Sequence, residues 1–486
     1  MSKPSWGAMP HPATMFFALT LAVAFGSWIC DVYGLRVWVP GTKEEIHVQS
    51  LLSPEGIRWA LRNIVSNFTG FAPLGQVLVA MFGIGVAQHA GFAEACIRLL
   101  SRRGLHPDGA LGSVIILGLL SNVAGDAGYV FLLPAAATLF LFAGLHPVAG
   151  VVVAYVSVGC GYSANVLLTT LDAQLASVTQ EAADTAGLTA ETISPLCNYL
   201  FFAASALLLG AVVFFLSRLC LLPSLGSWTG RHEGMTRKQL SSRERRALTV
   251  AFVTGGIYAG LTAWLTFSAH GILRSVSGGL THSPFIEGIL FLLSLGIGLM
   301  GGAYGFVSGR YRTDADLVSG LEQPARFLGG YLVMAFFAAQ MLACLRYSRL
   351  DTCLAVAGAD LLLSVPVGRL GSLLLFIVFT AVVNLLMVSA TSKWTFMAFI
   401  FVPVLADAGI APEAVQCAFR IGDSATNVAT PFMLYLPLAL ACIQQYVPSA
   451  TFGTLWRLTW RFSVCIFAAW ILLFAGWYLM EWPWGI

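Results

Sequence analysis

The sequence predicts an all-α polytopic membrane protein built on an inverted repeat, and three observations support this fold class. First, 58% of its 486 residues are hydrophobic and only 10% are charged, a composition typical of chains that cross a membrane many times. Second, nine segments have the roughly 20 apolar residues that a spanning helix needs. Third, the two halves carry similar polar motifs in the same order, which indicates an internal repeat.

The predicted spans are 14–36, 71–95, 147–169, 196–217, 247–268, 284–308, 326–346, 412–440 and 457–481. Two more apolar regions, 108–142 and 372–405, each consist of two short runs that meet at a polar motif. A run of a dozen residues is only about 18 Å long as a helix, whereas the hydrocarbon core is about 30 Å thick. We therefore expect nine transmembrane helices and two re-entrant helical hairpins.

The distribution of positive charge predicts the orientation. With the N-terminus in the cytoplasm, the predicted inner loops hold 16 Lys and Arg residues and the outer loops hold 8, as the positive-inside rule requires. The C-terminus is then periplasmic. The predicted organisation is an N-terminal helix and outer loop (1–56), repeat 1 with the first hairpin (57–172), central helices with a basic cytoplasmic loop (173–315), repeat 2 with the second hairpin (316–440) and a C-terminal helix (441–486).

The repeat pairs two series of motifs. The first is a polar motif at Ser121, then AGLHP, then GYSAN; the second is a polar motif at Ser389, then AGIAP, then DSATN. By the predicted topology the two hairpins enter from opposite faces, the arrangement that builds a transporter site at the midplane. The alternative is a chance similarity between apolar segments.

Two broken helices and two hairpin tips supply candidate ligands for a cation. Side-chain oxygens and freed carbonyls suit a hard cation such as sodium, or these groups only satisfy one another's hydrogen bonds. No cofactor is predicted beyond sodium or a proton as coupling ion. The candidate ion-binding residues are Ser121, Asn122, Asp126, Asn165, Ser389, Thr391 and Asn427.

Charged side chains occur in the second half where the first half has Val158 and Gly161. Arg420 and Asp423 are three residues apart on a predicted helix and can neutralise each other. Alternatively, the fork of Arg420 can bind a substrate carboxylate or sulfonyl group. Asp423 can also relay a proton if burial changes its pKa.

Trp394 and Asp172 are further candidates with two interpretations each. Trp394 follows Lys393 at the second hairpin tip, where it can stack on an aromatic substrate or only pack. Asp172 closes the first repeat, either as an ion or proton site or as an exposed loop residue.

At these residues the sequence resembles the AbgT family of bacterial transporters. The matching stretches are SNFTGFAPLG (66–75), SNVAGDAGYVFLLP (121–134), GYSANVLLTTLD (161–172), SATSKW (389–394) and RIGDSATN (420–427). The resemblance implies nine transmembrane helices and two hairpins per subunit, in a homodimer. It also implies transport of p-aminobenzoyl-glutamate, p-aminobenzoate or sulfonamides across the bacterial inner membrane.

The resemblance also implies roles for particular residues and leaves other questions open. It places substrate-binding functions on Trp394, Pro412, Arg420, Asp423 and Asp172. It fixes neither the direction of transport nor sodium against proton coupling. The predicted partners are a small aromatic carboxylate or sulfonamide, membrane lipid and a second copy of the chain, with no nucleic acid. Two other functions remain open: an intramembrane aspartate-dependent hydrolase and a passive anion channel.

Overall fold

The structure is a computed structural model, and it describes residues 11–38, 45–101, 106–124, 127–164, 166–188, 192–228, 240–268, 271–275, 283–322, 325–354, 356 and 367–485. Within these ranges the chain is mainly helical. Its strands are β1 (Arg36–Trp38) and β2 (Glu45–His47), which form one short antiparallel pair. The predicted class, an all-α membrane protein, is confirmed at this level.

The helices of the first half are α1 (Pro12–Val32), α2 (Pro54–Thr69), α3 (Ala72–His89), α4 (Phe92–Ser101), α5 (Pro107–Ser121), η1 (Asn122–Ala124), α6 (Ala127–Phe142), α7 (Pro147–Gly159), η2 (Cys160–Ser163) and α8 (Thr170–Thr185). Those that follow are α9 (Tyr199–Leu216), η3 (Ser217–Leu221), α10 (Leu222–Leu225), α11 (Ser242–Phe267), α12 (Pro284–Glu287), α13 (Ile289–Ser308), α14 (Asp314–Glu322), α15 (Ala325–Ser348), α17 (Arg369–Asn384), α18 (Ala390–Asp407), α19 (Pro412–Ala425), α20 (Leu436–Gln444) and α21 (Phe452–Leu479).

Seven helical stretches within the described residues are long and apolar enough to cross a membrane. They are Pro12–Val32, Pro54–His89, Tyr199–Leu225, Ser242–Phe267, Ile289–Ser308, Gly329–Ser348 and Phe452–Leu479, and each overlaps a predicted span. The other two predicted spans, 147–169 and 412–440, are interrupted, because the first helix stops at Ser163 and the second at Ala425. These are the two places where the sequence predicts broken helices.

The two halves repeat the same order of short helices. Helix α17 begins 262 residues after α5, and α19 begins 265 residues after α7. The pairs α5–α6 and α17–α18 fall on the two regions predicted as hairpins. One detail of the predicted repeat is wrong: Ser121 ends α5, whereas Ser389 precedes α18 as its N-cap, so the two serines occupy different places. The two serines were aligned because both lie in polar motifs, but the packing of the helices determines where each helix ends.

The motifs AGLHP and AGIAP have a structural explanation. Gly144 and Gly409, which follow α6 and α18, have positive φ angles of 75° and 76°, a conformation that favours glycine just after a helix. The prolines of the motifs, Pro147 and Pro412, are the first residues of the next helices, where a missing N–H costs nothing. Each motif is therefore a stop and start signal that sets the beginning of a broken helix.

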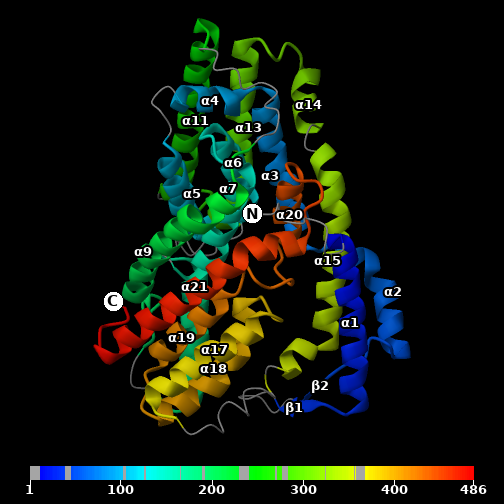
Figure 1. The fold of residues 1–486 in the computed structure, drawn as a ribbon, viewed down its shortest axis with the longest axis vertical. Helices are drawn as coiled ribbons and strands as arrows, with labels where there is room; N and C mark the ends of the chain where they lie inside the picture. The colour runs from blue at the N-terminus through cyan, green and yellow to red at the C-terminus, as the bar shows by residue number, and fades with distance from the viewer. Residues whose placement is uncertain are drawn as a thin grey trace.

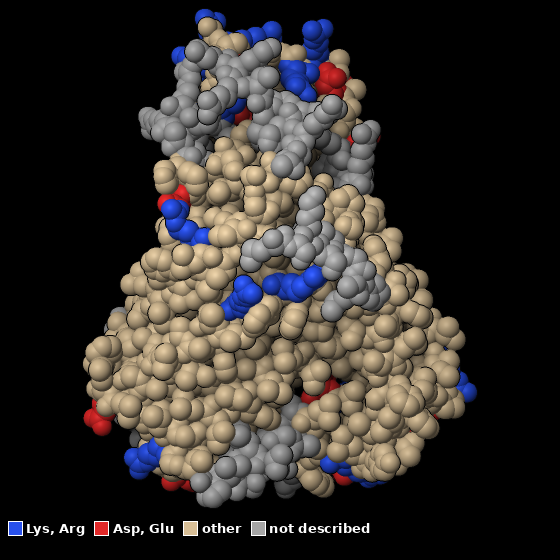
Figure 2. Space-filling model, in the orientation of Figure 1, with Lys and Arg blue, Asp and Glu red and all other residues tan. Residues whose placement is uncertain are grey.

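The helices form an elongated molecule with the site-bearing helices toward one end (Figure 1). Helices α17, α18 and α19 lie together there, with α21 crossing them; α11, α13 and α14 lie at the other end, and α1 and α2 lie on the same side of α15 in this view. On the face shown in Figure 2, most Lys, Arg, Asp and Glu side chains lie near the two ends, while the broad region between them carries few charges, among them a group of Lys or Arg side chains near the centre of the view. This distribution fits a surface that faces lipid.

Close helix packing positions α19 against α17. A Cβ atom added at Gly422 would lie 2.5 Å from the carbonyl oxygen of Ile377 and 2.7 Å from Cβ of Thr380. Only a glycine therefore allows this approach of the two backbones. The contact holds the charged part of α19 next to the end of α17.

We expect Gly422→Ala to lower the thermal stability of the protein measurably, because the added methyl group overpacks a contact with backbone atoms at a cost of about 1–3 kcal/mol. The measurement is the unfolding midpoint of the purified protein in detergent. Gly256→Ala is the matched control, since it is also helical and its added Cβ meets nothing within 4 Å. Equal midpoints for the two variants would contradict this packing argument.

Candidate functional site

The ends of the two broken helices lie side by side in the interior. The hydroxyl of Ser424 donates to that of Ser163 at 2.7 Å, and the Asn427 amide donates to the Gly159 carbonyl at 3.1 Å. All four residues are buried. The two breaks therefore satisfy part of each other's hydrogen-bonding capacity, as groups at interrupted helices within a membrane must.

The same hydrogen bond occurs at equivalent places in the two halves. Asn122, just after α5, donates its amide N–H to the carbonyl of Gly161 at 3.0 Å. Asn384, the last residue of α17, donates in the same way to the carbonyl of Asp423 at 2.5 Å. Both donors and both acceptors are 262 residues apart. Sequence reasoning missed Asn384; this spacing from Asn122 is the signal that identifies it.

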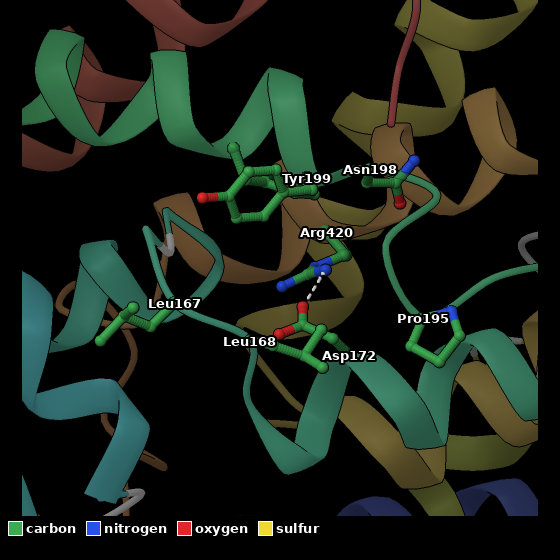
Figure 3. A pocket seen from close by; sticks show the side chains of 8 residues that line it. Leu167, Leu168, Asp172, Pro195, Asn198, Tyr199 and Arg420 are labelled. Atoms are coloured by element: carbon green, nitrogen blue, oxygen red, sulfur yellow. Dashed lines mark ion pairs between the residues drawn. The ribbon is translucent and has the colours of Figure 1, made fainter. Parts of the chain in front are cut away.

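One buried ion pair joins the second repeat to the end of the first. Arg420 Nη1 of α19 lies 2.5 Å from Asp172 Oδ1 of α8, as Figure 3 shows. The other oxygen of Asp172 accepts from the backbone N–H and the hydroxyl of Thr169, both at 2.7 Å. Thr169 is the N-cap of α8, and the two residues form a capping box. Asp172 is thus a buried residue, so its alternative interpretation as an exposed loop residue is wrong.

Arg420 retains hydrogen-bonding capacity after this pairing. Its Nε and Nη2 atoms are buried without a hydrogen-bond partner, although a buried unpaired donor is costly. Its guanidinium carbon also lies 4.2 Å from the ring centre of Phe202. The side chain lines a small pocket together with Leu167, Leu168, Asp172, Pro195, Asn198, Tyr199 and Phe202 (Figure 3).

The pocket is narrow. Its interior volume of about 10 Å³ is roughly that of one water molecule. Exposed Leu167 and Leu168 border it, so an organic ligand can reach the guanidinium only after the lining segments move apart.

A second buried ion pair joins α18 to α19. Lys393 Nζ of α18 lies 2.5 Å from Asp423 Oδ1 and also donates to Asn384 Oδ1. The side chains of Lys393 and Asp423 are 0% and 2% exposed. The interpretation that Arg420 and Asp423 neutralise each other is therefore wrong: each is paired with a residue from a neighbouring helix.

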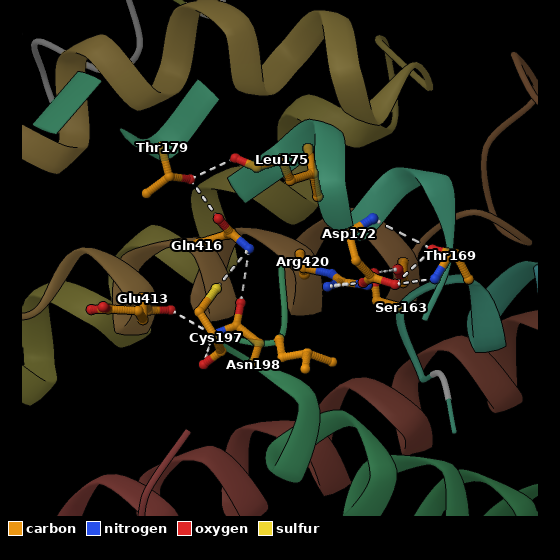
Figure 4. Close-up of polar contacts among 12 residues, drawn as sticks. Ser163, Thr169, Asp172, Leu175, Thr179, Cys197, Asn198, Glu413, Gln416 and Arg420 are labelled. Carbon is orange, nitrogen blue, oxygen red and sulfur yellow. Dashed lines mark hydrogen bonds and ion pairs between the residues drawn. The ribbon is translucent and has the colours of Figure 1, made fainter. Parts of the chain in front are cut away.

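Trp394 lies in the interior, at one end of a series of hydrogen-bonded polar side chains. Its indole N–H donates to the Thr179 hydroxyl at 2.8 Å, and its ring centre is 4.5 Å from that of Phe419. The Thr179 hydroxyl is 2.5 Å from Gln416 Oε1. Gln416 in turn donates to Asn198 Oδ1 at 3.1 Å, as Figure 4 shows. The chain of contacts links Trp394 to the pocket at Asn198; sequence reasoning missed both Gln416 and Asn198.

The remaining predicted residues lie elsewhere or outside the described ranges. Pro412 is half-buried at the first position of α19, two turns before Arg420. Ser121 donates to the Gly118 carbonyl within its own helix. Ser389 is exposed and bonds to Ser392, and it lies 3.5 Å from Thr391 in oxygen–oxygen distance. Asp126 and Asn165 lie outside the described residues.

We expect Arg420→Met to destabilise the protein by about 3–5 kcal/mol, because it leaves the buried carboxylate of Asp172 without its counter-charge. Asp172→Asn removes that charge and keeps an oxygen for the cap of α8. The double variant should therefore recover much of the loss. Unfolding midpoints of the four proteins form a double-mutant cycle, and additive effects would show that the pair contributes no coupling.

Comparisons with known proteins agree with this arrangement. A profile described as the AbgT putative transporter family matches residues 6–486. The p-aminobenzoyl-glutamate transport protein of Escherichia coli (strain K12) is 31% identical over 481 residues, which cover 98% of this chain and 94% of that protein.

Two solved structures are similar along almost their full length. The YdaH transporter of Alcanivorax borkumensis is 36% identical with a TM-score of 0.53, covering 98% of this chain and 100% of that one. MtrF of Neisseria gonorrhoeae, described as representing a class of antimetabolite efflux pumps, is 36% identical with a TM-score of 0.51, covering 97% and 95%. These relatives are transporters and pumps rather than enzymes, so the hydrolase alternative is not supported. The chain belongs to the AbgT putative transporter family.

Proposed function

We propose that this protein is an ion-coupled secondary transporter of p-aminobenzoyl-glutamate, p-aminobenzoate or sulfonamide-like aromatic compounds in the bacterial inner membrane. The observation that carries the proposal is the buried Arg420, which lines a pocket and has two N–H-bearing nitrogens without partners. The names of the relatives support the substrate class, since one transports p-aminobenzoyl-glutamate and another exports antimetabolites.

The pocket chemistry suits an aromatic acid. A guanidinium fork binds a carboxylate through two parallel hydrogen bonds, and a sulfonyl group offers a similar pair of oxygens. Phe202 and Tyr199 supply aromatic surface, and Asn198 supplies an amide beside Arg420. The substrate would accept hydrogen bonds from Nε and Nη2 of Arg420, which are costly to leave unpaired. Binding would therefore remove the free-energy cost that these unpaired donors carry.

Transport requires that this closed pocket open to each side in turn. We propose nine transmembrane helices and two re-entrant hairpins, α5–α6 and α17–α18, entering from opposite faces, with the N-terminus cytoplasmic and the C-terminus periplasmic. The hairpins and the broken helices α7 and α19 would move as one body against a scaffold that dimerises. The packing of α5 and α6 on α7, and of α17 and α18 on α19, supports this grouping.

The coupling ion is proposed to be sodium or a proton. Its candidate ligands are Asn122 and Asn427, which carry amide oxygens near the breaks; their burial supports this assignment. Ser121 is half-buried, whereas Ser389 and Thr391 lie at the more accessible start of α18.

Opposite entry of the hairpins predicts opposite labelling of their open ends. We expect His106→Cys, before α5, to react with a membrane-impermeant maleimide only from the cytoplasmic face. Ala408→Cys, after α18, should react only from the periplasmic face. Both positions are exposed, and the variants are made in a background without the native cysteines. Labelling of both from one face would rule out the inverted arrangement, and labelling after permeabilisation is the control.

The transport proposal predicts concentrative flux that depends on Arg420. Proteoliposomes are given labelled p-aminobenzoyl-glutamate or a sulfonamide under an imposed sodium or proton gradient. Saturable accumulation against the solute gradient would exclude a passive channel. We expect Arg420→Lys to raise KM about 10–100-fold, because a lysine keeps the charge but loses the fork, worth about 1.5–3 kcal/mol.

Arg58→Lys is the matched control, since Arg58 is an exposed residue of α2 paired only with Glu55 among the ion pairs of the described residues. It should transport like the unaltered protein. An unchanged KM in Arg420→Lys would remove Arg420 from the substrate site. No gradient-dependent flux of any of these compounds would refute the proposed function.

A further inference from the structure

The two breaks are alike in backbone bonding but differ in charge. In the second half Asp423 accepts the asparagine bond, and its carboxylate pairs with Lys393. In the first half the position 262 residues before Asp423 is Gly161. The position 262 residues before Lys393 is Phe131. A lysine and an aspartate thus stand where the first half has two uncharged residues.

This difference is built into the packing. A Cβ atom at Gly161 would lie 2.6 Å from Cδ2 of Leu119, so a side chain there would require the Leu119 side chain to move. The second break instead accommodates a full ion pair, with Lys393 and Asn384 completely buried.

The oxygens around the Lys393 ammonium are arranged as ligands for a cation. Asp423 Oδ1 lies 2.5 Å from Nζ, and Asn384 Oδ1 accepts from it. The Asn384 amide nitrogen donates to the Asp423 carbonyl at 2.5 Å and to Asn427 Oδ1 at 2.9 Å. These bonds turn its oxygen toward Nζ. Carboxylate and amide oxygens at a helix end in a membrane protein are typical sodium ligands.

We propose that Lys393 is a tethered cation, whose ammonium permanently occupies a cation site formed by Asp423 and Asn384. The Asp423 carboxylate is thereby neutralised without a free ion, and sodium does not bind to Asp423 and Asn384 in the native protein. The inference deepens the proposed function, because it assigns any sodium coupling to groups other than Asp423. Its test does not require transport.

Removing the ammonium should open the site to sodium. We expect the full-length protein with Lys393→Ala, purified in detergent, to unfold several degrees higher in sodium chloride than in choline chloride of equal ionic strength. A ligand that binds only the folded state stabilises it in this way. Radioactive sodium should also bind to this variant in excess of the native protein, at about one ion per chain.

Matched variants separate a cation site from a merely structural ion pair. Lys393→Ala with Asp423→Asn lacks the carboxylate, and Lys393→Arg keeps a cation, so both should respond to sodium no more than the native protein does. The native protein should show a smaller rise in unfolding midpoint with sodium chloride than Lys393→Ala does. Lys393→Gln supplies an extra amide oxygen in a side chain of similar length, and it should respond to sodium like Lys393→Ala.

Three results would overturn the inference. The first is a folded Lys393→Ala that unfolds equally in both salts. The second is a native protein whose unfolding midpoint rises in sodium chloride as much as that of Lys393→Ala, if Asp423→Asn abolishes this rise. The third is failure of both Lys393→Ala and Lys393→Gln to fold in either salt, since sodium then does not replace the ammonium. Folding in sodium but not in choline would support it. None of these results bears on whether Arg420 binds substrate.

Discussion

Interrupted helices in an apolar interior must find partners for the backbone groups that the interruption frees. Each such group costs about 1–3 kcal/mol when buried without a hydrogen bond. Here one asparagine per half, Asn122 and Asn384, donates to a carbonyl near the end of the adjacent broken helix. The breaks also bond to each other through Ser163 and Ser424. The two halves therefore stabilise each other at the point where each is weakest, and the centre of the molecule is specified by these few polar contacts.

The charges of the centre obey the same constraint. A lone charge in a membrane interior is expensive, and such residues usually face a partner. Arg420 pairs with Asp172 and Lys393 pairs with Asp423, so each pair is neutral. Neither pair is local: one connects α19 to α8 and the other connects α18 to α19. The exception is the pair of unbonded nitrogens on Arg420. Because these two nitrogens belong to a charged group that lines a pocket, a ligand bound there would supply the hydrogen bonds that they lack.

The sequence predicts the features that depend on local signals, and it does not predict those that depend on how helices pack. Runs of apolar residues predict seven of the observed spans, and the motifs GYSAN and DSATN predict the interruptions after Ser163 and Ala425. The partners of Arg420 and Asp423 were not predictable, because i,i+3 spacing suggested that they pair with each other. Their partners depend on which helices lie against α19, and spacing along one helix does not contain that information. Gln416 was missed for the same reason: its role comes from Thr179 and Asn198 on other segments.

The two halves of the repeat have different roles: the first break has glycines that allow close packing, and the second has the charged side chains. Gly159 and Gly161 leave no room for side chains: a Cβ at Gly159 would lie 2.8 Å from Val428, and one at Gly161 would meet Leu119. The first break is therefore a surface of backbone against which the second can pack. The second break carries Arg420 and Asp423 where the first has Val158 and Gly161. Because the Cβ-free surface lets these helices approach closely, the ionic groups are held away from lipid. The two breaks thus depend on each other at Gly159, where an added side chain would take space that Val428 of the second half occupies.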